Sequence, residues 1–301
     1  MGYAIGIDLG GTNIKAVAIA PDGELLEQSS RAVGDETADA LAETVRRQIV
    51  EFERKRGAKA SWIGLACPGQ PAPDGLSTAS AGGPLHVLEG LVWTNVLDAR
   101  NPVPVLNDAH AALVGEVWKG AGRGCRDAVL LTLGTGVGGA ILSDGRLLKG
   151  HTGRAGHLGH MCLNVDGTPD MVGMPGSLED AIGNCTLAAR SGGRFTVTRE
   201  LVEAHLRGDA AASEVWLRSV YQLACAAASI INIVDPEVVI LGGGMARAGA
   251  ALFDPLERFM DQVEWRPQGN RVPILPAALG HMAGAIGSAY YAMRGNATAF
   301  V

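Results

Sequence analysis

A strand, a glycine-rich turn and a second strand occur twice in the chain, and this duplication limits the possible folds more than any other feature. The first copy is the run 3–20, YAIGIDLGGTNIKAVAIA, and the second is the run 127–148, DAVLLTLGTGVGGAILSDGRLL. In both copies, apolar residues flank a turn that contains glycine and threonine. A supersecondary unit that occurs twice predicts two similar α/β lobes.

The composition agrees with such lobes. Hydrophobic residues make up 47% of the 301 residues and aromatic residues only 5%, which predicts an aliphatic core around a helix-covered parallel or mixed sheet. The net charge is −6 and the basic residues are dispersed, which argues against nucleic acid as a partner. The five cysteines lack CxxC spacing, which predicts reduced thiols in a cytoplasmic protein. We expect no signal peptide and no membrane span, because the apolar run 224–234 is short and contains Ser229 and Asn232.

Hydrophobic spacing predicts the elements outside the two copies. Helices are expected over residues 37–56, 110–119, 178–191, 199–207, 210–234, 248–263 and 284–294, and strands over 24–31, 62–67, 238–241 and 273–275. The run 70–96 predicts a long loop with a short strand around 76–79. We interpret it as a substrate wall, with a plain surface loop as the alternative. The N-terminal lobe is placed at residues 1–118, with a closing segment at about 284–301 packing back on it, and the C-terminal lobe at 119–283.

An acidic residue, Asp108, follows the short apolar strand 102–106. Ligands of open α/β sheets lie at the carboxyl ends of strands, so Asp108 is the candidate chemical base. Asn and Asp also cap helices, and Asp108 could equally begin the helix that follows. Asn107 could instead be the cap while Asp108 faces a ligand.

Three glycine clusters are candidate nucleotide-binding loops. Glycine lets backbone N–H groups approach phosphate oxygens, and threonine adds a hydroxyl donor. None of the clusters has the P-loop or dinucleotide-binding pattern, and each alone could be an ordinary turn. Asp8, at the end of the first strand, is placed to hold Mg²⁺ through water. The candidate ATP-binding residues are Asp8, Gly10, Gly11, Thr12 and Lys15 in the first copy, Gly134, Thr135 and Gly136 in the second, and Gly242, Gly243 and Gly244, which suit an adenosine.

These segments resemble the ROK family, which comprises repressors, open-reading-frame proteins and sugar kinases. The resemblance covers nearly the whole chain and rests on the runs 7–15 (IDLGGTNIK), 107–109 (NDA), 133–139 (LGTGVGG), 156–160 (GHLGH) and 241–244 (LGGG). It implies the actin/hexokinase/Hsp70-like ATPase fold, with two duplicated ribonuclease H-like lobes and a cleft between them. Because the first strand begins near Tyr3, an enzyme is expected rather than a repressor with an N-terminal helix-turn-helix.

The resemblance implies an ATP- and Mg²⁺-dependent sugar kinase. Asp108 would take the proton from a sugar hydroxyl, usually at C6, as that oxygen attacks the γ-phosphate. Asn107 would hydrogen-bond neighbouring hydroxyls, and His157, His160 and Glu179 would line the sugar site. Phosphoryl transfer requires mainly positioning and neutralisation of charge, so one carboxylate, a metal ion and N–H-lined loops suffice. The resemblance also implies a homodimer.

The sequence departs from the family pattern at His157, where the family's GEIGH motif has a glutamate. A glutamate accepts two hydroxyl protons, whereas a neutral histidine accepts one and donates one. We therefore expect that plain glucose is not the best substrate. A modified hexose, an amino or N-acyl sugar, a ketose or a cyclic polyol is equally open. The alternatives are a structural role for His157 and, for Glu179, a carboxylate favoured by a helix dipole.

A second departure removes the family's zinc ligands. The family's closing histidine, here His160, ligates zinc together with three cysteines. In the segment 170–179 these cysteines are replaced by Asp170, Val172 and Ser177, while Glu179 is retained. Structural zinc prefers thiolate or imidazole ligands, so we predict no structural zinc. We expect capping and the packing of Met171, Val172, Met174 and Leu178 to hold the loop. A metal seated by His157 and His160 near Cys162 is a less favoured alternative.

Two other functions stay open. A catalytically inactive, sugar-binding regulator of the same family would bind sugar without releasing ADP. An ATPase of the same fold that acts on proteins would release ADP without added sugar. An ADP-release assay with a panel of sugars and polyols separates both from a sugar kinase.

Overall fold

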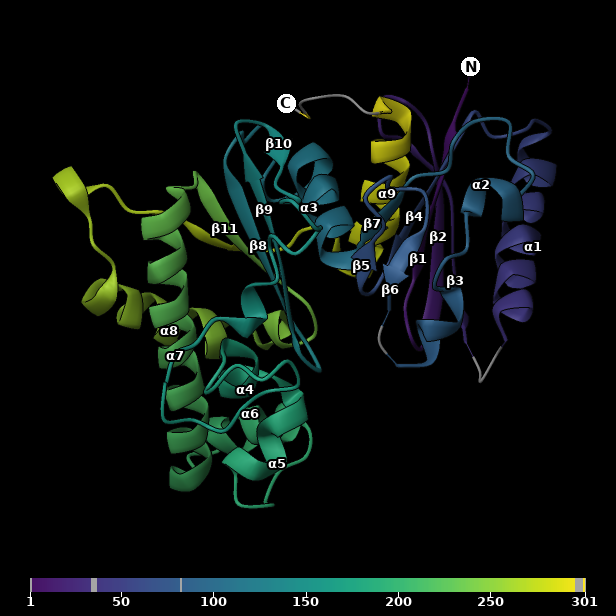
Figure 1. The fold of residues 1–301 in the computed structure, drawn as a ribbon. Coiled ribbons are helices and arrows are strands. Elements are labelled where there is room, and N and C mark those ends of the chain that lie inside the picture. The colour runs from purple at the N-terminus through teal and green to yellow at the C-terminus, as the bar shows by residue number, and fades with distance from the viewer. Residues whose placement is uncertain (1, 34–36, 82, 296–299, 301) are drawn as a thin grey trace. The chain divides into compact units, whose positions relative to one another are not determined.

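The computed structural model describes residues 2–33, 37–81, 83–295 and 300, and the chain divides into two compact units (Figure 1). Unit 1 comprises Met1–Arg126, Asp144–Ala155 and Ala278–Val301, and unit 2 comprises Asp127–Ser143 and Gly156–Ala277. Each of the duplicated hairpins belongs to a five-stranded mixed sheet of its own. The predicted α/β class with two similar sheets is therefore confirmed. The lobe boundary at residues 118 and 119 stays a prediction.

The sheet of unit 1 has the order β3-β2-β1-β4-β7. Its strands are β1 (Ala4–Leu9), β2 (Asn13–Ile19), β3 (Leu25–Ala32), β4 (Trp62–Cys67) and β7 (Val105–Asn107). The first three strands form an antiparallel meander, and β4 and β7 run parallel to β1. The register places Asp8 opposite Ala66 and Cys67 opposite Asn107. The carboxyl ends of β1, β4 and β7 therefore meet at one edge of the sheet.

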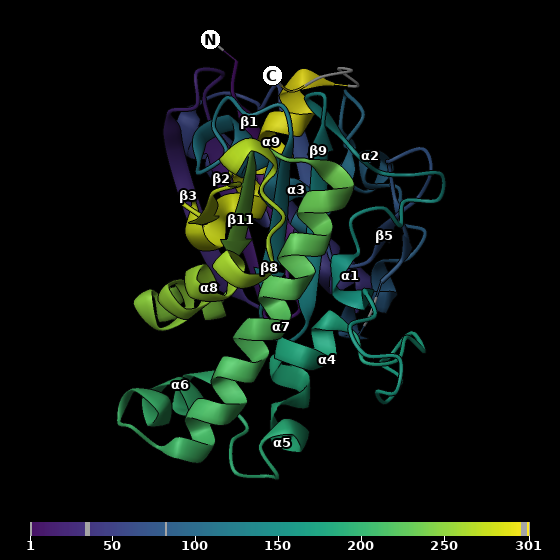
Figure 2. The ribbon, with the colours of Figure 1, turned by 90° about the vertical axis from the view of Figure 1, so that its left-hand side faces the viewer.

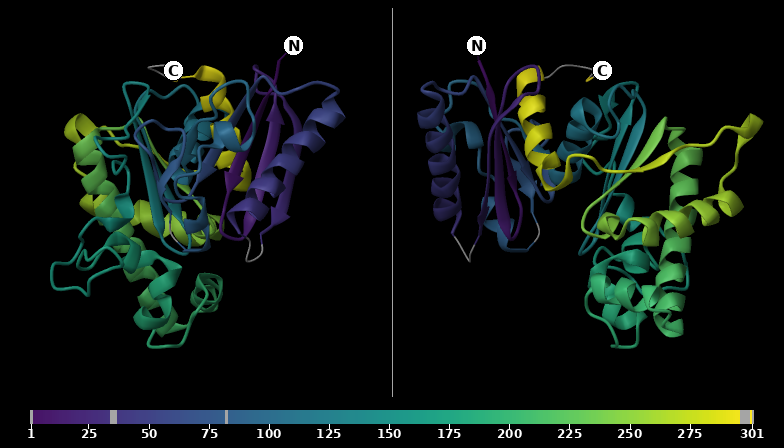
Figure 3. Two further views of the ribbon diagram at one scale, coloured as in Figure 1. Left: turned by 45° about the vertical axis from the view of Figure 1, so that its right-hand side comes forward. Right: turned by 180° about the vertical axis from the view of Figure 1, so that it is seen from behind.

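Helices cover both faces of this sheet, with α1 on one side and α9 on the other (Figure 3). The helices of unit 1 are α1 (Ala38–Arg56), α2 (Trp93–Val96), α3 (Asp108–Lys119) and α9 (Ala283–Arg294). Helix α1 buries Leu41, Val45, Ile49 and Phe52 at the predicted helical spacing.

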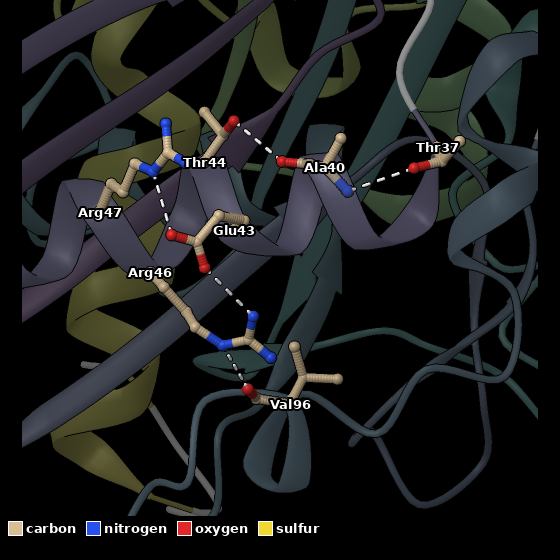
Figure 4. Close-up of polar contacts among 7 residues, drawn as sticks. All are labelled: Thr37, Ala40, Glu43, Thr44, Arg46, Arg47 and Val96. Carbon is tan, nitrogen blue, oxygen red and sulfur yellow. Dashed lines mark hydrogen bonds and ion pairs between the residues drawn. The ribbon is translucent and has the colours of Figure 1, made fainter.

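The exposed face of α1 is polar (Figure 4). Thr37 caps its start by accepting the N–H of Ala40 at 3.3 Å. Glu43 lies between two arginines, Arg46 and Arg47, at 3.4 and 3.0 Å. The Nε of Arg46 also donates to the carbonyl of Val96 at 2.9 Å, which joins α1 to α2.

Helix α9 approaches the backbone of its neighbours closely because glycine removes the Cβ at the contacts. A Cβ on Gly6 of β1 would lie 1.9 Å from the carbonyl oxygen of Ala285, and one on Gly287 would lie 1.7 Å from that of Ala111. The small residues of α9 are thus a requirement of packing. Residues 296–299 and 301 of the closing segment lie outside the described residues.

The run 70–96 carries structure of its own. It contains a two-stranded sheet of β5 (Gln70–Pro71) and β6 (Thr78–Ser80), a 3₁₀ turn η1 (Gly83–Leu88) and helix α2. Leu88 and Trp93 are fully buried in the core of unit 1. The segment is therefore packed rather than a plain surface loop, and its role as a substrate wall stays a prediction.

The second sheet has the order β10-β9-β8-β11-β12, and helices of unit 2 pack on it (Figure 2). The strands are β8 (Ala128–Leu133), β9 (Val137–Ser143), β10 (Arg146–Leu147), β11 (Val238–Gly242) and β12 (Ile274–Pro276). The helices of unit 2 are α4 (Leu178–Ile182), α5 (Leu187–Arg190), α6 (Thr198–Leu206), α7 (Ala210–Val234) and α8 (Ala250–Val263). Short 3₁₀ turns are η2 (Leu158–His160), η3 (Asn184–Thr186), η4 (Met245–Ala248), η5 (Pro267–Gly269) and η6 (Gly280–Met282).

The helix predicted over 178–191 is wrong, because the chain breaks at Gly183 into α4, η3 and α5. Gly183 is extended, with φ −56° and ψ 149°. A Cβ there would lie 2.6 Å from the carbonyl oxygen of Glu179 and 3.0 Å from that of Thr135. The chain therefore leaves the helix in order to pass against the second glycine hairpin.

The expectation that no apolar run is long enough to cross a membrane is wrong for helix α7. Within the described residues it is one helix of 25 residues that is long and apolar enough to do so. Half of its most apolar stretch is buried, and Trp216, Val220 and Leu223 lie in the core of unit 2. The packing is that of a core helix, which passes the same test of length and composition.

Candidate active site

Asn107 is the cap of helix α3, which decides between the two capping alternatives. Its side-chain oxygen accepts the N–H groups of Ala109 and His110 at 3.0 and 3.2 Å. Its amide nitrogen donates to the carbonyl of Gly69 at 3.0 Å. Asn107 is buried, so the end of β7 is fixed by three hydrogen bonds of one side chain. Its contact with a substrate stays a prediction.

Asp108 is the first residue of α3 and is exposed, directly after the buried cap. One of its carboxylate oxygens lies 2.8 Å from the N–H of Ala109. A carboxylate in the first turn of a helix is stabilised by the helix dipole. The position thus offers an accessible carboxylate on a rigid element, which is what proton abstraction from a bound hydroxyl requires.

Asp8, one residue before the end of β1, has only 8% of its surface exposed, and Lys15 of β2 lies 3.1 Å from its carboxylate. Burial raises the pKa of Asp8, Lys15 opposes that shift, and the charge of Asp108 adds to it. A Cβ on Gly284 would lie 3.0 Å from the Asp8 carboxylate, so the start of α9 forms a wall beside it. A divalent cation would offset the cost of this enclosed charge, and oxygen is the ligand that Mg²⁺ prefers. Asp8 therefore fits a site that holds Mg²⁺ through water.

The first glycine hairpin presents N–H groups at its tip. Gly10 donates to the carbonyl of Asn13 at 3.0 Å, which closes the turn. Gly11 and Thr12 are exposed, and their N–H groups donate to no other residue in the described part of the chain. These N–H groups are available to an anion such as phosphate.

The second hairpin is held by its carbonyl groups. The carbonyls of Gly134 and Thr135 accept the N–H groups of Asn184 and Cys185 at 3.0 and 2.8 Å. The N–H of Gly134 donates to Gly136 at 2.9 Å. Because the carbonyls are tied to the segment 184–185, the N–H side of the turn is left for a negatively charged group.

Glu179 lies beside this second hairpin. It accepts the N–H of Val137 at 2.9 Å, and a Cβ on Gly136 would lie 2.1 Å from its carboxylate oxygen. Glu179 is also in the first turn of α4. Its observed contact therefore supports the second hairpin, and its contact with sugar stays a prediction.

The third glycine cluster follows β11 and meets the second hairpin. Gly243 has φ +86°, and a Cβ there would lie 2.3 Å from the carbonyl oxygen of Leu133, so only glycine fits. A cavity of about 530 Å³ opens between the two clusters, a size that suits a nucleoside. Its lining residues are Gly134, Thr135, Asn184, Val197, Thr198, Arg199, Val202, Glu203, Gly244, Met245, Arg247 and Ala248.

Sequence reasoning missed most of the walls of this cavity. Asn184 accepts the N–H and hydroxyl of Thr198 at 2.8 and 2.9 Å, which joins the start of α6 to the hairpin region. Nothing in the local pattern of α6 marks it as a cavity wall. Met245, Arg247 and Ala248 follow Gly244 closely, and these are the wall residues that proximity to a motif could have suggested.

His157 and His160 lie at the two ends of η2, and both are partly buried. The turn packs on β9, because a Cβ on Gly159 would lie 2.0 Å from the carbonyl oxygen of Val137. The Nδ1 of His160 lies 2.8 Å from the Oδ2 of Asp170. Unit 2 thus brings His160 and Glu179 to the strand that carries the second hairpin.

In the segment 170–179, the expected apolar packing is wrong for three of the four residues that were predicted to provide it. Met171, Val172 and Met174 are 83%, 60% and 37% exposed, and only Leu178 is buried. The side chain of Asp170 is instead fully enclosed. Its Oδ1 accepts the N–H groups of Val172 and Met174, both at 2.9 Å. The expected capping is confirmed by Ser177, the N-cap of α4, but the carboxylate of Asp170 takes the place of the expected apolar packing.

These residues do not fit a structural zinc. Both carboxylate oxygens of Asp170 are already engaged by hydrogen bonds, and the exposed side chain of Val172 cannot ligate. Among the described residues, no three His, Cys, Asp or Glu side chains are grouped so that they could hold a metal ion. The absence of zinc in the protein stays a prediction for metal analysis.

Comparison with known proteins gives one consistent result. The family model described as "ROK family" matches residues 4–294. The chain is 34% identical to a glucokinase from Thermotoga maritima over 283 residues, which cover 86% of this chain and 87% of the relative.

Solved structures agree over both units. The ROK hexokinase from Thermus thermophilus is 30% identical, with a TM-score of 0.83 and coverage of 97% of this chain and 98% of that one. A ROK family glucokinase from Streptomyces griseus, in complex with glucose and AMPPNP, is 26% identical, with a TM-score of 0.78 and coverage of 98% and 100%. The ATPase fold that the sequence motifs implied is thereby confirmed.

Proposed function

This chain belongs to the ROK family, and we propose that it is an ATP-dependent sugar kinase with Asp108 as its general base. It transfers the γ-phosphoryl group of ATP to a hydroxyl, of the C6 type, on a hexose or a hexose-like sugar. The observation that carries this proposal is that Asn107 caps the helix, so the carboxylate of Asp108 is not needed as the cap. Asn107 caps α3 from a buried position, and the adjacent carboxylate is exposed at the end of a parallel strand.

Asp108 takes the proton of the acceptor hydroxyl as its oxygen bonds to the γ-phosphorus, and ADP leaves with the electrons of the broken bond. The N–H groups of the two hairpins, at Gly11, Thr12, Thr135 and Gly136, hold the phosphates. Asp8 would hold Mg²⁺ through water, and the ion would neutralise charge on the transferred group. Lys15 adds a positive charge beside Asp8 at 3.1 Å.

The adenosine lies on Gly243 and Gly244, in the cavity whose volume is about 530 Å³. Gly242 ends β11 and brings the cluster to this position. The sugar is bound by Asn107, His157, His160 and Glu179. With an imidazole at His157 in place of a carboxylate, the pocket offers both a donor and an acceptor, so a modified hexose is the better substrate than glucose.

ADP release with a panel of acceptors tests the activity. Glucose, mannose, N-acetylglucosamine, N-acetylmannosamine, fructose and a cyclic polyol are supplied with Mg-ATP, and phosphorus NMR locates the new ester. Sugar-dependent ADP release with phosphate on a primary hydroxyl supports the proposal. Sugar binding without ADP release would identify an inactive regulator, and ADP release without sugar would identify an ATPase.

We also propose that the enzyme is a cytoplasmic homodimer. Use of ATP as the phosphoryl donor fits a location where ATP is abundant. Light scattering coupled to size-exclusion chromatography tests the oligomer, and a monomer at micromolar concentration would contradict it.

A further inference from the structure

The positions of the family's missing cysteines still converge in this chain, now without thiols. The carboxylate of Asp170 accepts hydrogen bonds from the N–H groups of Val172 and Met174, both at 2.9 Å. The hydroxyl of Ser177 lies close enough to lower the pKa of the same carboxylate. The Nδ1 of His160 completes the set at 2.8 Å. Asp170 is itself one of the three replaced positions. Its carboxylate accepts the backbone N–H of the second, Val172, and lies beside the third, Ser177.

We propose that Asp170 is a positioning residue: it joins His160 to the loop 161–177 and fixes which nitrogen of the imidazole faces the sugar as an acceptor. An ionised carboxylate only accepts hydrogen bonds, so Nδ1 of His160 must carry its proton. The other nitrogen, Nε2, is then left as an acceptor, whereas a cation on Nδ1 would leave the proton on Nε2 and make that nitrogen a donor. His160 keeps a quarter of its side chain exposed, which leaves the ring open to a ligand.

The ionised state of Asp170 follows from its surroundings. Burial by itself would raise its pKa, but the imidazole of His160, the N–H groups of Met174 and Val172 and the hydroxyl of Ser177 together lower it to about 2. The geometry agrees, because the N–H groups of Val172 and Met174 can only donate, so Oδ1 of Asp170 must accept at both 2.9 Å contacts.

Helix α4 connects the surroundings of Asp170 to the second glycine hairpin. Ser177, whose hydroxyl helps to lower the pKa of Asp170, is the N-cap of α4 and accepts the N–H of Asp180 at 3.2 Å. Two residues after Ser177, Glu179 accepts the N–H of Val137 at 2.9 Å. A loop that came away from Asp170 would therefore loosen both His160 and the support of the hairpin.

The activity readout of this proposal rests on the proposed sugar kinase function, so a second readout is independent of turnover. In Asp170→Asn the amide oxygen keeps the two bonds to Val172 and Met174, and the NH₂ group faces Nδ1. We expect the proton of the His160 ring to move to Nε2, which long-range ¹⁵N–¹H NMR of the imidazole detects. We expect the KM for sugar to rise about 10-fold to 100-fold, and the KM for ATP to stay within about 2-fold, because the loop remains anchored.

Asp166→Asn is the matched control, because Asp166 is an exposed aspartate in the same loop. It leaves the tautomer of His160 and both KM values unchanged. An unchanged tautomer in Asp170→Asn would overturn the proposal, as would an unchanged sugar KM. A wild-type chain that phosphorylates no sugar would instead overturn the proposed function, and the NMR result would then still decide the role of Asp170.

Asp170→Ala removes all the hydrogen bonds of the carboxylate and tests the anchoring of the loop. We expect limited proteolysis within residues 161–177 to be at least about 10-fold faster than in the wild type, because a flexible loop is cleaved faster than a fixed one. Val172→Ala, at an exposed side chain whose N–H is retained, keeps the wild-type rate. Equal rates in Asp170→Ala and the wild type would overturn the proposal.

Discussion

Asn107 accepts the N–H of His110 at 3.2 Å and so caps helix α3, immediately before the exposed carboxylate of Asp108. The cap is buried and the carboxylate is not. Changing Asp108 therefore tests chemistry with little effect on the fold.

Asp108→Asn removes the base without changing the shape of the side chain. We expect kcat to fall about 100-fold to 10,000-fold, the typical contribution of a general base, while ATP affinity and the melting temperature stay close to wild type. Asp39→Asn is the control, because Asp39 is also exposed and lies in the first turn of a helix, α1. Retained turnover in Asp108→Asn would show that another group takes the proton.

Gly243→Ala tests the third glycine cluster. The new Cβ would lie 2.3 Å from the carbonyl oxygen of Leu133, at a φ of +86°, so we expect a loss of at least about 1 kcal/mol in the free energy of unfolding. We also expect weaker binding of ATP, measured by calorimetry. The neighbour Gly244 has a helical φ of −63° and a nearest atom at 3.9 Å, so Gly244→Ala keeps the wild-type free energy of unfolding. Similar losses in the two variants would contradict the special role of Gly243.

The start of α7 predicts a dependence of stability on pH. Asp209 accepts the N–H of Ala212 at 2.9 Å and pairs with Arg194. The hydrogen bond from Arg194 and the N–H of Ala212 lower the pKa of Asp209 to about 2 from 3.8. Below an unfolded pKa of 3.8 the unfolded chain binds more protons, so this stabilisation is complete above that pH and is lost as the pH falls through about 2.

Urea unfolding of the wild type and of Asp209→Asn therefore gives a difference that is constant from pH 7 to about pH 4 and shrinks below it. Arg194→Gln removes the partner and reduces the same difference. A difference between wild type and Asp209→Asn that stays constant down to pH 3 would contradict this linkage.

Metal analysis tests the predicted absence of structural zinc. Protein purified without a histidine tag is expected to contain far less than one zinc per chain by mass spectrometry. Treatment with a strong chelator, followed by return of Mg²⁺, leaves the melting temperature and kcat unchanged, because the loop 161–177 is held by Asp170. Stoichiometric zinc would refute the prediction.

The sequence predicted the features that depend on local pattern. The repeated strand–turn–strand units gave the two sheets, because apolar alternation and turn glycines act over a few residues. The choice between Asn107 and Asp108 as cap needed the structure, because both residue types accept backbone N–H groups equally well.

The errors came from contacts between distant segments. Directly after the break at Gly183, Asn184 and Cys185 donate to the carbonyls of Gly134 and Thr135, which lie 50 residues earlier in the chain. The role of Asp170 depends on backbone N–H groups and on His160, and hydropathy carries no signal for either. The α6 residues that line the cavity beside the second hairpin were missed for the same reason.

Gly284 of α9 lies beside Asp8 of β1. A strand made at the beginning of translation therefore contacts a helix made near its end. A ribosome must deliver residue 284 before the carboxylate on β1 has its final surroundings. A prematurely terminated product that stops before α9 therefore lacks one side of the Asp8 environment, however well its first sheet has formed.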